Sequence, residues 1–175
     1  SSLTPFMVDG VVVLLNDIDA SSISEWIPIG TAANPFSGNF DGGGNLISNI
    51  NWTIDASKYA DAGIFGCIKG ASIIGLNVGA AGNRITVKGN ASALNAGVIA
   101  GNASGGSLTG CINYADLVYE GNASGGSVCL AGICGRSSAN IASCTNKGNI
   151  LSPVVCRAAG FVAYNEGKVE GCINY

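Results

Sequence analysis

The sequence predicts an all-β fold: a right-handed parallel β-helix with three sides, about five to six coils and pectin-lyase-like architecture. Three observations lead to this prediction. Glycine is abundant, with 27 residues in 175, and charged residues make up only 11%. Two short apolar phrases recur in step along the chain. Between them lie Gly, Asn and Ser, which form turns, and no helical periodicity is visible.

The first repeated phrase is an Ala-Gly pair followed by apolar residues. Its copies begin at residues 62, 96, 131 and 159, which are 34, 35 and 28 residues apart. The glycines predict corners where a Cβ atom would forbid the bend or a positive φ. In this phrase Cys134 takes the position of Phe65, Ile99 and Val162, which predicts a small buried hydrophobe.

The second phrase predicts three ladders, because stacked coils place equivalent residues about 4.8 Å apart. The expected aliphatic ladder consists of Ile73, Leu108, Ile141 and Val169. The second ladder consists of Leu76, Cys111, Cys144 and Cys172. The third is an asparagine ladder, hydrogen-bonded between coils, of Asn113, Asn146 and Asn174.

A third apolar stretch completes most units, at residues 84–87, 116–119 and 149–151. Each coil is therefore expected to hold three short strands. We expect one β-helix domain over 1–175, in which 1–45 form an N-terminal capping coil and 46–175 form repeats of about 26–35 residues.

In two segments, Leu15 to Ile47 and Ala96 to Tyr114, the chain resembles a family of bacterial surface proteins of gut anaerobes that carry GLUG-type repeats on a β-helix. The segment from Leu15 to Ile47, with Trp26-Ile27-Pro28-Ile29-Gly30 and Phe36 to Gly44, is similar to the leading coil of that family. The segment from Ala96 to Tyr114 is similar to its repeat. The resemblance implies an extracellular, adhesin-like module of a bacterial surface or secreted protein.

The chemistry of the side chains argues against an enzyme. The chain has no histidine, which removes the commonest general base and most zinc sites. Asp17, Asp19 and Asp41 form the one candidate carboxylate cluster, and capping of turns is favoured over catalysis or calcium binding. No catalytic residue, metal or cofactor is expected.

Seven cysteines cannot all pair with one another. The stacked cysteines are expected to lie about 4.8 Å apart, farther than the ~3.8 Å Cβ separation of a disulfide, which favours buried free thiols. Cys129 and Cys156, which precede successive Ala-Gly corners, are the remaining disulfide candidates.

Tyr114, Tyr119 and Tyr175 are the candidate binding residues, as an exposed aromatic strip for stacking sugars; scattered surface tyrosines are the alternative. A net charge of −3 disfavours nucleic acid and anionic membranes as partners. No apolar segment approaches the ~20 residues that cross a bilayer, so membrane insertion is not expected.

Three functions remain, in order of preference. The first is a non-catalytic extracellular module that binds glycans or host or cell-surface proteins. The second is a self-assembling structural subunit that associates end to end through its C-terminal coil, which stops midway through a repeat. The third is a polysaccharide-active enzyme.

Overall fold

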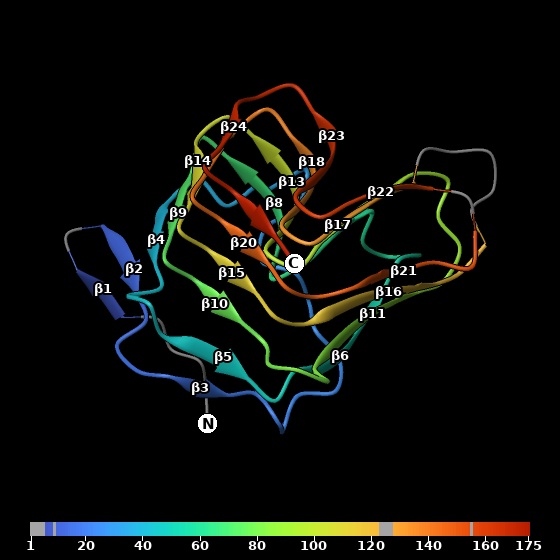
Figure 1. Cartoon of the computed structure of the whole chain (residues 1–175), viewed down its shortest axis with the longest axis horizontal. Helices are drawn as coiled ribbons and strands as arrows, with labels where there is room; N and C mark the ends of the chain where they lie inside the picture. The colour runs from blue at the N-terminus through green and yellow to red at the C-terminus, as the bar shows by residue number, and fades with distance from the viewer. Residues whose placement is uncertain (1–5, 9, 123–127, 155) are drawn as a thin grey trace.

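The computed structural model describes residues 6–8, 10–122, 128–154 and 156–175. These residues form strands β1 to β25 and no helix. Apart from one antiparallel pair, β1 with β2, all strand pairs are parallel. The chain winds counterclockwise from the blue strands at the back to the red strands at the front (Figure 1), so the solenoid is right-handed. The predicted parallel β-helix is confirmed.

The strands stack into five sheets, which we name A to E. Sheet A contains β1 (Phe6–Val8), β2 (Val11–Val13), β4 (Asn39–Asp41), β9 (Ser72–Ile74), β14 (Ser107–Thr109), β19 (Asn140–Ala142) and β24 (Val169–Glu170). Sheet B contains β3 (Ile18–Asp19), β5 (Leu46–Ser48), β10 (Asn77–Val78), β15 (Ile112–Asn113), β20 (Thr145–Asn146) and β25 (Ile173–Asn174). Sheet C contains β6 (Asn51–Asp55), β11 (Arg84–Lys88), β16 (Asp116–Glu120) and β21 (Ile150–Leu151).

The remaining two sheets follow sheet C in each coil. Sheet E contains β7 (Asp61–Ala62), β12 (Leu94–Gly97), β17 (Val128–Ala131) and β22 (Arg157–Ala159). Sheet D contains β8 (Phe65–Lys69), β13 (Ala100–Ser104), β18 (Cys134–Ser137) and β23 (Val162–Asn165). The coil order is therefore A, B, C, E, D.

Two details of the prediction were wrong. Each complete coil has five strands rather than three, because two-residue bends divide the apolar phrases, as between β9 and β10. The stack also has about four turns rather than five or six. The difference in turns arises in the first coil, where most of the chain between β3 and β4 pairs only through isolated bridges.

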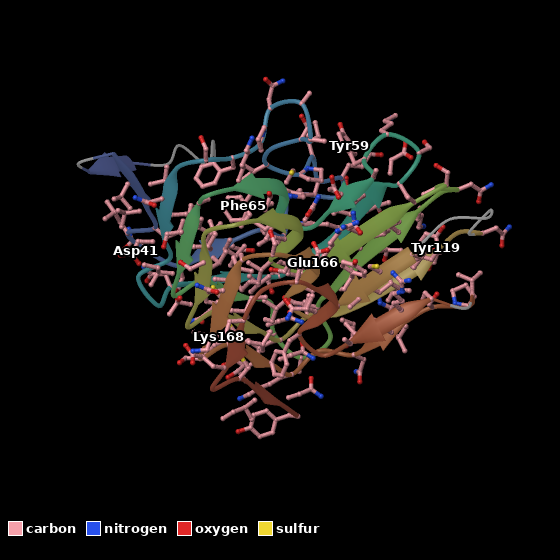
Figure 2. The ribbon with its side chains drawn as sticks, turned by 90° about the horizontal axis from the view of Figure 1, so that it is seen from above. Asp41, Tyr59, Phe65, Tyr119, Glu166 and Lys168 are labelled. Carbon is pink, nitrogen blue, oxygen red and sulfur yellow. The ribbon has the colours of Figure 1, made fainter. Side chains whose placement is uncertain are left out.

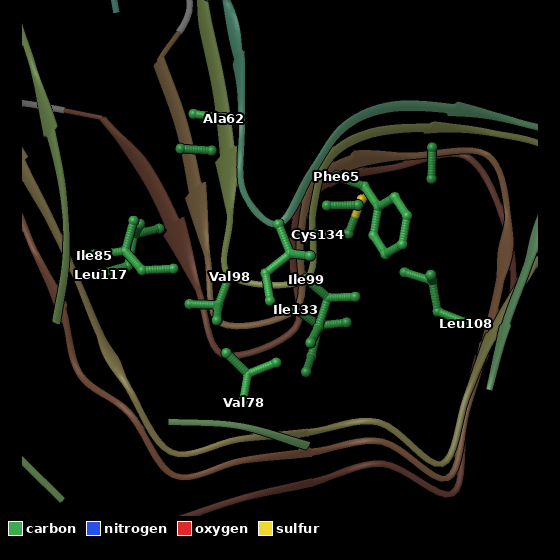
Figure 3. Close-up of a cluster of buried hydrophobic side chains, with 14 of the residues drawn as sticks. Ala62, Phe65, Val78, Ile85, Val98, Ile99, Leu108, Leu117, Ile133 and Cys134 are labelled. Carbon is green, nitrogen blue, oxygen red and sulfur yellow. The ribbon is translucent and has the colours of Figure 1, made fainter. Parts of the chain in front are cut away.

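The core fills the inside of the stack. Sheets E and D do not continue a convex outline; the bend between them points inward, and Val98 and Ile133 at its tip approach Val78 of sheet B (Figure 3). Ile85 and Leu117 stack on one side of this bend, whereas Phe65 and Leu108 lie on the other. All of these side chains are at least 98% buried.

The predicted aliphatic ladder is confirmed. Ile73 pairs with Leu108, Leu108 with Ile141, and Ile141 with Val169, in parallel register. The first three are fully buried, whereas Val169 of the last coil is 40% exposed. Phe40 of β4 extends the same ladder into the first coil.

The cysteine ladder also has the predicted alignment. The amide that follows each ladder residue donates to the carbonyl of the ladder residue in the preceding coil: Ile112 N to Leu76 O, Thr145 N to Cys111 O and Ile173 N to Cys144 O. Cys111 and Cys144 are fully buried, and Cys172 is partly buried. All three cysteines carry free thiols, so they occupy the interior as small hydrophobes.

The asparagine ladder is present as well. Asn113 Nδ2 donates to Asn146 Oδ1 at 2.8 Å, and Asn146 Nδ2 donates to Asn174 Oδ1 at 2.8 Å. The Asn113 and Asn146 amides also donate to the carbonyls of Ala115 and Gly148, at 2.9 and 3.0 Å. These bonds satisfy polar groups that lie inside an otherwise apolar core.

Aromatic contacts hold the first coil against the second. The Trp26 ring stacks on Trp52 with a centroid distance of 4.5 Å, and Trp26 Nε1 donates to Gly63 O at 3.1 Å. Phe36 and Phe40 both pack on Phe65, at 5.1 and 5.4 Å between centroids. Such pairs add stabilisation beyond the area they bury, which compensates for the few strands of this coil.

Candidate functional site

The inward bend between sheets E and D forms a re-entrant corner on the outer surface of the solenoid. At this corner the two sheets approach so closely that several positions have room only for glycine. A Cβ atom at Gly101 would lie 2.5 Å from Ala62 N, and one at Gly135 would lie 2.6 Å from Ala96 N. The backbone of one wall thus packs directly on the backbone of the other.

The glycines of the Ala-Gly phrase act through this close approach and not through a positive φ, which none of them adopts. A Cβ atom at Gly97 would lie 2.3 Å from Ala100 O, and one at Gly132 would lie 2.2 Å from Asn146 Oδ1. The corner that the sequence predicted is confirmed, but its mechanism is steric exclusion of side chains at the tip of the bend.

Where the two walls separate, their outward side chains form two columns, which we call the corner cluster. In register along sheet E lie Asp61, Asn95, Cys129 and Arg157. In register along sheet D lie Cys67, Asn102, Arg136 and Tyr164. Because successive coils are about 4.8 Å apart, each column offers one side chain per coil over roughly 14 Å.

Asp61 occupies the end of the corner nearest the first coil. Its Oδ1 accepts a hydrogen bond of 2.8 Å from Asn95 Nδ2. Burial raises the pKa of Asp61, although the bond from Asn95 and the charge of Arg136 act in the opposite direction. Burial, together with the Asp61 charge, also raises the pKa of Cys67. This end of the corner is therefore a half-buried acidic position.

Two arginines occupy the opposite end. The Arg136 guanidinium lies over the Tyr164 ring with 4.5 Å from Cζ to the centroid, and Arg157 lies over the same ring at 5.4 Å. Arg136 Nη2 is 3.8 Å from Glu166 Oε2, and Tyr164 Oη donates to Glu166 Oε1 at 3.3 Å. The corner thus runs from a carboxylate through two amides to a pair of guanidiniums on an aromatic ring.

The predicted tyrosine strip is only partly present. Tyr119 is fully buried, because strand alternation turns it to the core face of β16, and its hydroxyl donates to Gly89 O at 3.2 Å. The inclusion of Tyr119 in an exposed strip was therefore wrong. Tyr114 and Tyr175 do share a surface, where Lys147 Nζ lies 5.0 Å and 5.2 Å from their ring centroids.

This arrangement limits sugar stacking on the two surface tyrosines. The ammonium group of Lys147 lies over both rings in a cation–π contact. Since each ring already has a cation over one face, Tyr114 and Tyr175 provide a weaker platform than the prediction assumed.

Two of the three candidate aspartates, Asp19 and Asp41, cap turns, and Asp17 bonds to the next coil. Asp17 Oδ1 accepts from Leu46 N, and Asp41 Oδ1 accepts from Gly43 N, both at 2.8 Å. Asp19 Oδ1 accepts from Ser21 N at 2.9 Å. In the described ranges no three His, Cys, Asp or Glu side chains group so that they could hold a metal ion.

One prediction about cysteines was wrong, and another was correct in part. Cys129 lies opposite Arg157 in the ladder, and Cys156 carries a free thiol, so the candidate disulfide between these two cysteines is not formed. Cys134 lies in one ladder with Phe65 and Val162, as predicted. In the coil between Phe65 and Cys134 this ladder holds Ala100 rather than Ile99, because that copy of the phrase has one more residue before its last glycine. Cys134 is nevertheless fully buried, as expected.

The sequence also carries a signal for the corner cluster, although none of its residues is among the predicted binding residues. Asp61 and Asn95 directly precede the first two Ala-Gly pairs, and Asn102 and Arg136 directly follow the last glycine of their phrases. Polar residues that flank a glycine corner in several repeats lie on its outer side, whichever way the corner bends.

Comparisons of the chain with protein-family models, with curated proteins and with solved structures gave no match. In the part of the chain that the structure describes, no helix is long and apolar enough to cross a membrane.

Proposed function

We propose that the protein is a non-catalytic extracellular module that binds a glycan chain along the re-entrant corner. The proposal rests on one observation: polar and aromatic side chains of successive coils converge in two columns parallel to the solenoid axis. Cys67 and Cys129 are at least 93% buried. A polymer that lies along the axis can therefore contact the other corner side chains: Asp61, Asn95, Asn102, Arg136, Arg157 and Tyr164. The proposed likeness to GLUG-repeat surface proteins supplies the setting, outside or on a bacterial cell.

The chemistry of the corner supports a hydroxyl-rich ligand. Amide and carboxylate groups can donate to or accept from hydroxyl groups, and an aromatic ring such as Tyr164 adds apolar contact. Within the described part of the chain, Asn102 is half-buried and its side chain makes no hydrogen bond. Its amide is thus available to a ligand.

The same groups give little support for glycoside hydrolysis. That reaction generally uses two carboxyl groups on either side of the scissile bond. At the corner Asp61 accepts a hydrogen bond from the Asn95 amide. Glu166 forms an ion pair with Arg136 and accepts a hydrogen bond from Tyr164. We therefore keep the enzyme as the third candidate, and turnover assays on any bound glycan would test it.

A glycan array tests the proposal. We expect at least one linear glycan to bind, and we expect Asn102→Ala to weaken that binding about fivefold or more through loss of a hydrogen bond. Tyr114→Ala, which alters the surface tyrosines outside the corner, should leave the affinity within about twofold. Absence of binding to every glycan, or equal affinities for Asn102→Ala and the unmodified chain, would reject the proposal.

Self-association through the last coil is the second candidate. Ile173 and Tyr175 are 53% and 77% exposed, and β24 and β25 lie at the edges of sheets A and B. Exposed apolar side chains beside unpaired strand edges favour pairing with another strand. Sedimentation velocity over a range of concentrations tests this candidate: Ile173→Lys should abolish any concentration-dependent increase in mass, and a constant monomer mass rejects it.

A further inference from the structure

We propose that the arginine end of the corner selects an anionic group, either a carboxylate or a sulfate ester, and that the ligand is consequently an acidic glycan. This inference rests on the proposed function, because it specifies the substrate class of the same corner. It starts from the contacts of Arg136, Arg157 and Tyr164.

Two guanidinium groups from different sheets share one aromatic ring. Arg136 comes from β18 of sheet D and Arg157 from β22 of sheet E, and both lie over Tyr164. A guanidinium holds its five N–H donors in a rigid planar fork. These donors can then bind both oxygens of a carboxylate or sulfate.

Glu166 shows where such an anion would lie. Its Oε1 accepts a hydrogen bond from Tyr164 Oη, and its Oε2 forms an ion pair with Arg136. Both partners of the ion pair are about half exposed, with side-chain exposures of 47% and 53%. Exposed ion pairs contribute little to stability, so an anionic ligand can displace Glu166. Figure 2 views the molecule from the side on which Glu166 lies.

The corner has opposite charges at its two ends, which gives the site a direction. Asp61 lies three coils from Arg157 in the same column, roughly 14 Å away at the spacing of stacked strands. The half-buried carboxylate of Asp61 repels an anion and accepts hydrogen bonds from hydroxyl groups. The ligand should therefore place its acidic substituent at the coil of β22 and β23, and neutral hydroxyls near β7.

The net charge of the chain distinguishes local recognition of an anion at this site from non-specific attraction of polyanions. The net charge is −3, so the overall field disfavours an acidic polymer. Binding of such a polymer would need local contacts, and removal of a cation elsewhere on the surface would have little effect. Lys147, which lies between Tyr114 and Tyr175, provides that matched control.

The test compares dextran, carboxymethyl dextran and dextran sulfate, which share a backbone and differ in charge. Affinities are measured by calorimetry for the unmodified chain and for Arg136→Gln, Glu166→Gln and Lys147→Gln, after circular dichroism has shown that each variant is folded. We expect Arg136→Gln to weaken binding of an acidic dextran about tenfold through loss of a charge-assisted bond. Glu166→Gln should tighten it severalfold, and Lys147→Gln should change it less than twofold.

The outcomes separate the two proposals. Preference for carboxymethyl dextran or for dextran sulfate identifies the anion, and either preference supports the inference. Equal binding of all three dextrans, no binding of either acidic dextran, or equal effects of Arg136→Gln and Lys147→Gln would overturn it. If array glycans still bind and depend on Asn102, the corner remains a glycan site without selection for charge.

Discussion

Asn113 Nδ2 donates a hydrogen bond of 2.8 Å to Asn146 Oδ1 in the following coil, and both side chains are at least 98% buried. At the same position in the preceding coil stands Val78. The ladder therefore changes from aliphatic to polar between two adjacent coils. It can do so because the amides are satisfied by each other and by the backbone.

Asn146→Ala should destabilise the protein by about 3 kcal/mol, because it leaves buried groups of Asn113 and Gly148 without their partner. The free energy of unfolding in urea measures this loss. Asn174→Ala is the matched control: Asn174 accepts the last bond of the ladder but is exposed, so its removal should cost less than about 1 kcal/mol. Equal losses for the two variants would contradict the role of burial.

Gly97→Val should cost more than about 3 kcal/mol or prevent folding, since its Cβ would lie 2.3 Å from Ala100 O. Thermal unfolding followed by circular dichroism measures the effect. Gly105 has a φ of +69°, and a Cβ atom added there would meet no heavy atom within 4 Å; asparagine tolerates that conformation. Gly105→Asn should therefore lower stability by no more than about 1 kcal/mol. A larger loss than for Gly97→Val would refute the steric argument.

The free energy of unfolding of Asp61→Asn, relative to that of the unmodified chain, should increase as pH rises. Burial raises the pKa of Asp61 above its ordinary value of 3.8, so the folded state holds this proton to a higher pH than the unfolded state. The free energy of unfolding of the unmodified chain consequently falls as pH rises from about 3.8 through the raised pKa. Urea denaturation near pH 4 and pH 7 compares the two proteins.

Asp19 provides a control of opposite sign. Hydrogen bonds from Asn49 and Ser21 lower the pKa of Asp19, so its ionised form stabilises the folded state and this contribution is lost as pH falls. Asp19→Asn should therefore become more destabilising as pH rises. If both variants followed the same trend, the assignment of burial as the cause at Asp61 would fail.

The thiols of Cys134 and Cys144 should resist alkylation in the folded protein. Burial raises the pKa of Cys134, and the hydrogen bond with Cys111 together with burial raises that of Cys144. The thiolate is the reactive form, so iodoacetamide at about pH 8 should label both only after unfolding in urea. Cys156, which is partly exposed, should react first; labelling of Cys134 before Cys156 in peptide mass spectra would contradict the packing.

Repeat spacing alone was enough to predict the stacking of coils. Ile73, Leu108 and Ile141 are aligned as expected although they are 35 and 33 residues apart. The bend after each of them has the same form, with a positive φ at Gly75, Gly110 and Ser143. The direction of the Ala-Gly corner could not be predicted, since glycine permits a bend in either direction. The inward bend separates sheet E from sheet D and creates the surface that carries Arg136 and Tyr164.

Tyr119 illustrates a second limit of sequence reasoning. In β16 the core face holds Leu117 and Tyr119, whereas Val118 lies on the outer face. Tyr119 is in register with Val87 and Ile54, both fully buried. The period of two in this strand indicates that Tyr119 faces the core, whereas residue type alone groups it with Tyr114 and Tyr175.

The connections between sheets differ in how much their number of residues varies from coil to coil. Two residues join sheet E to sheet D in every coil, as in β12 to β13 and β17 to β18, whereas the connection from sheet C to sheet E is five residues after β11 and seven after β16. Strands on both sides of the longer connection stay in register. A peptide inserted at the junction of sheets C and E would therefore be displayed as a loop without shifting any ladder, which makes this edge the natural place for grafting.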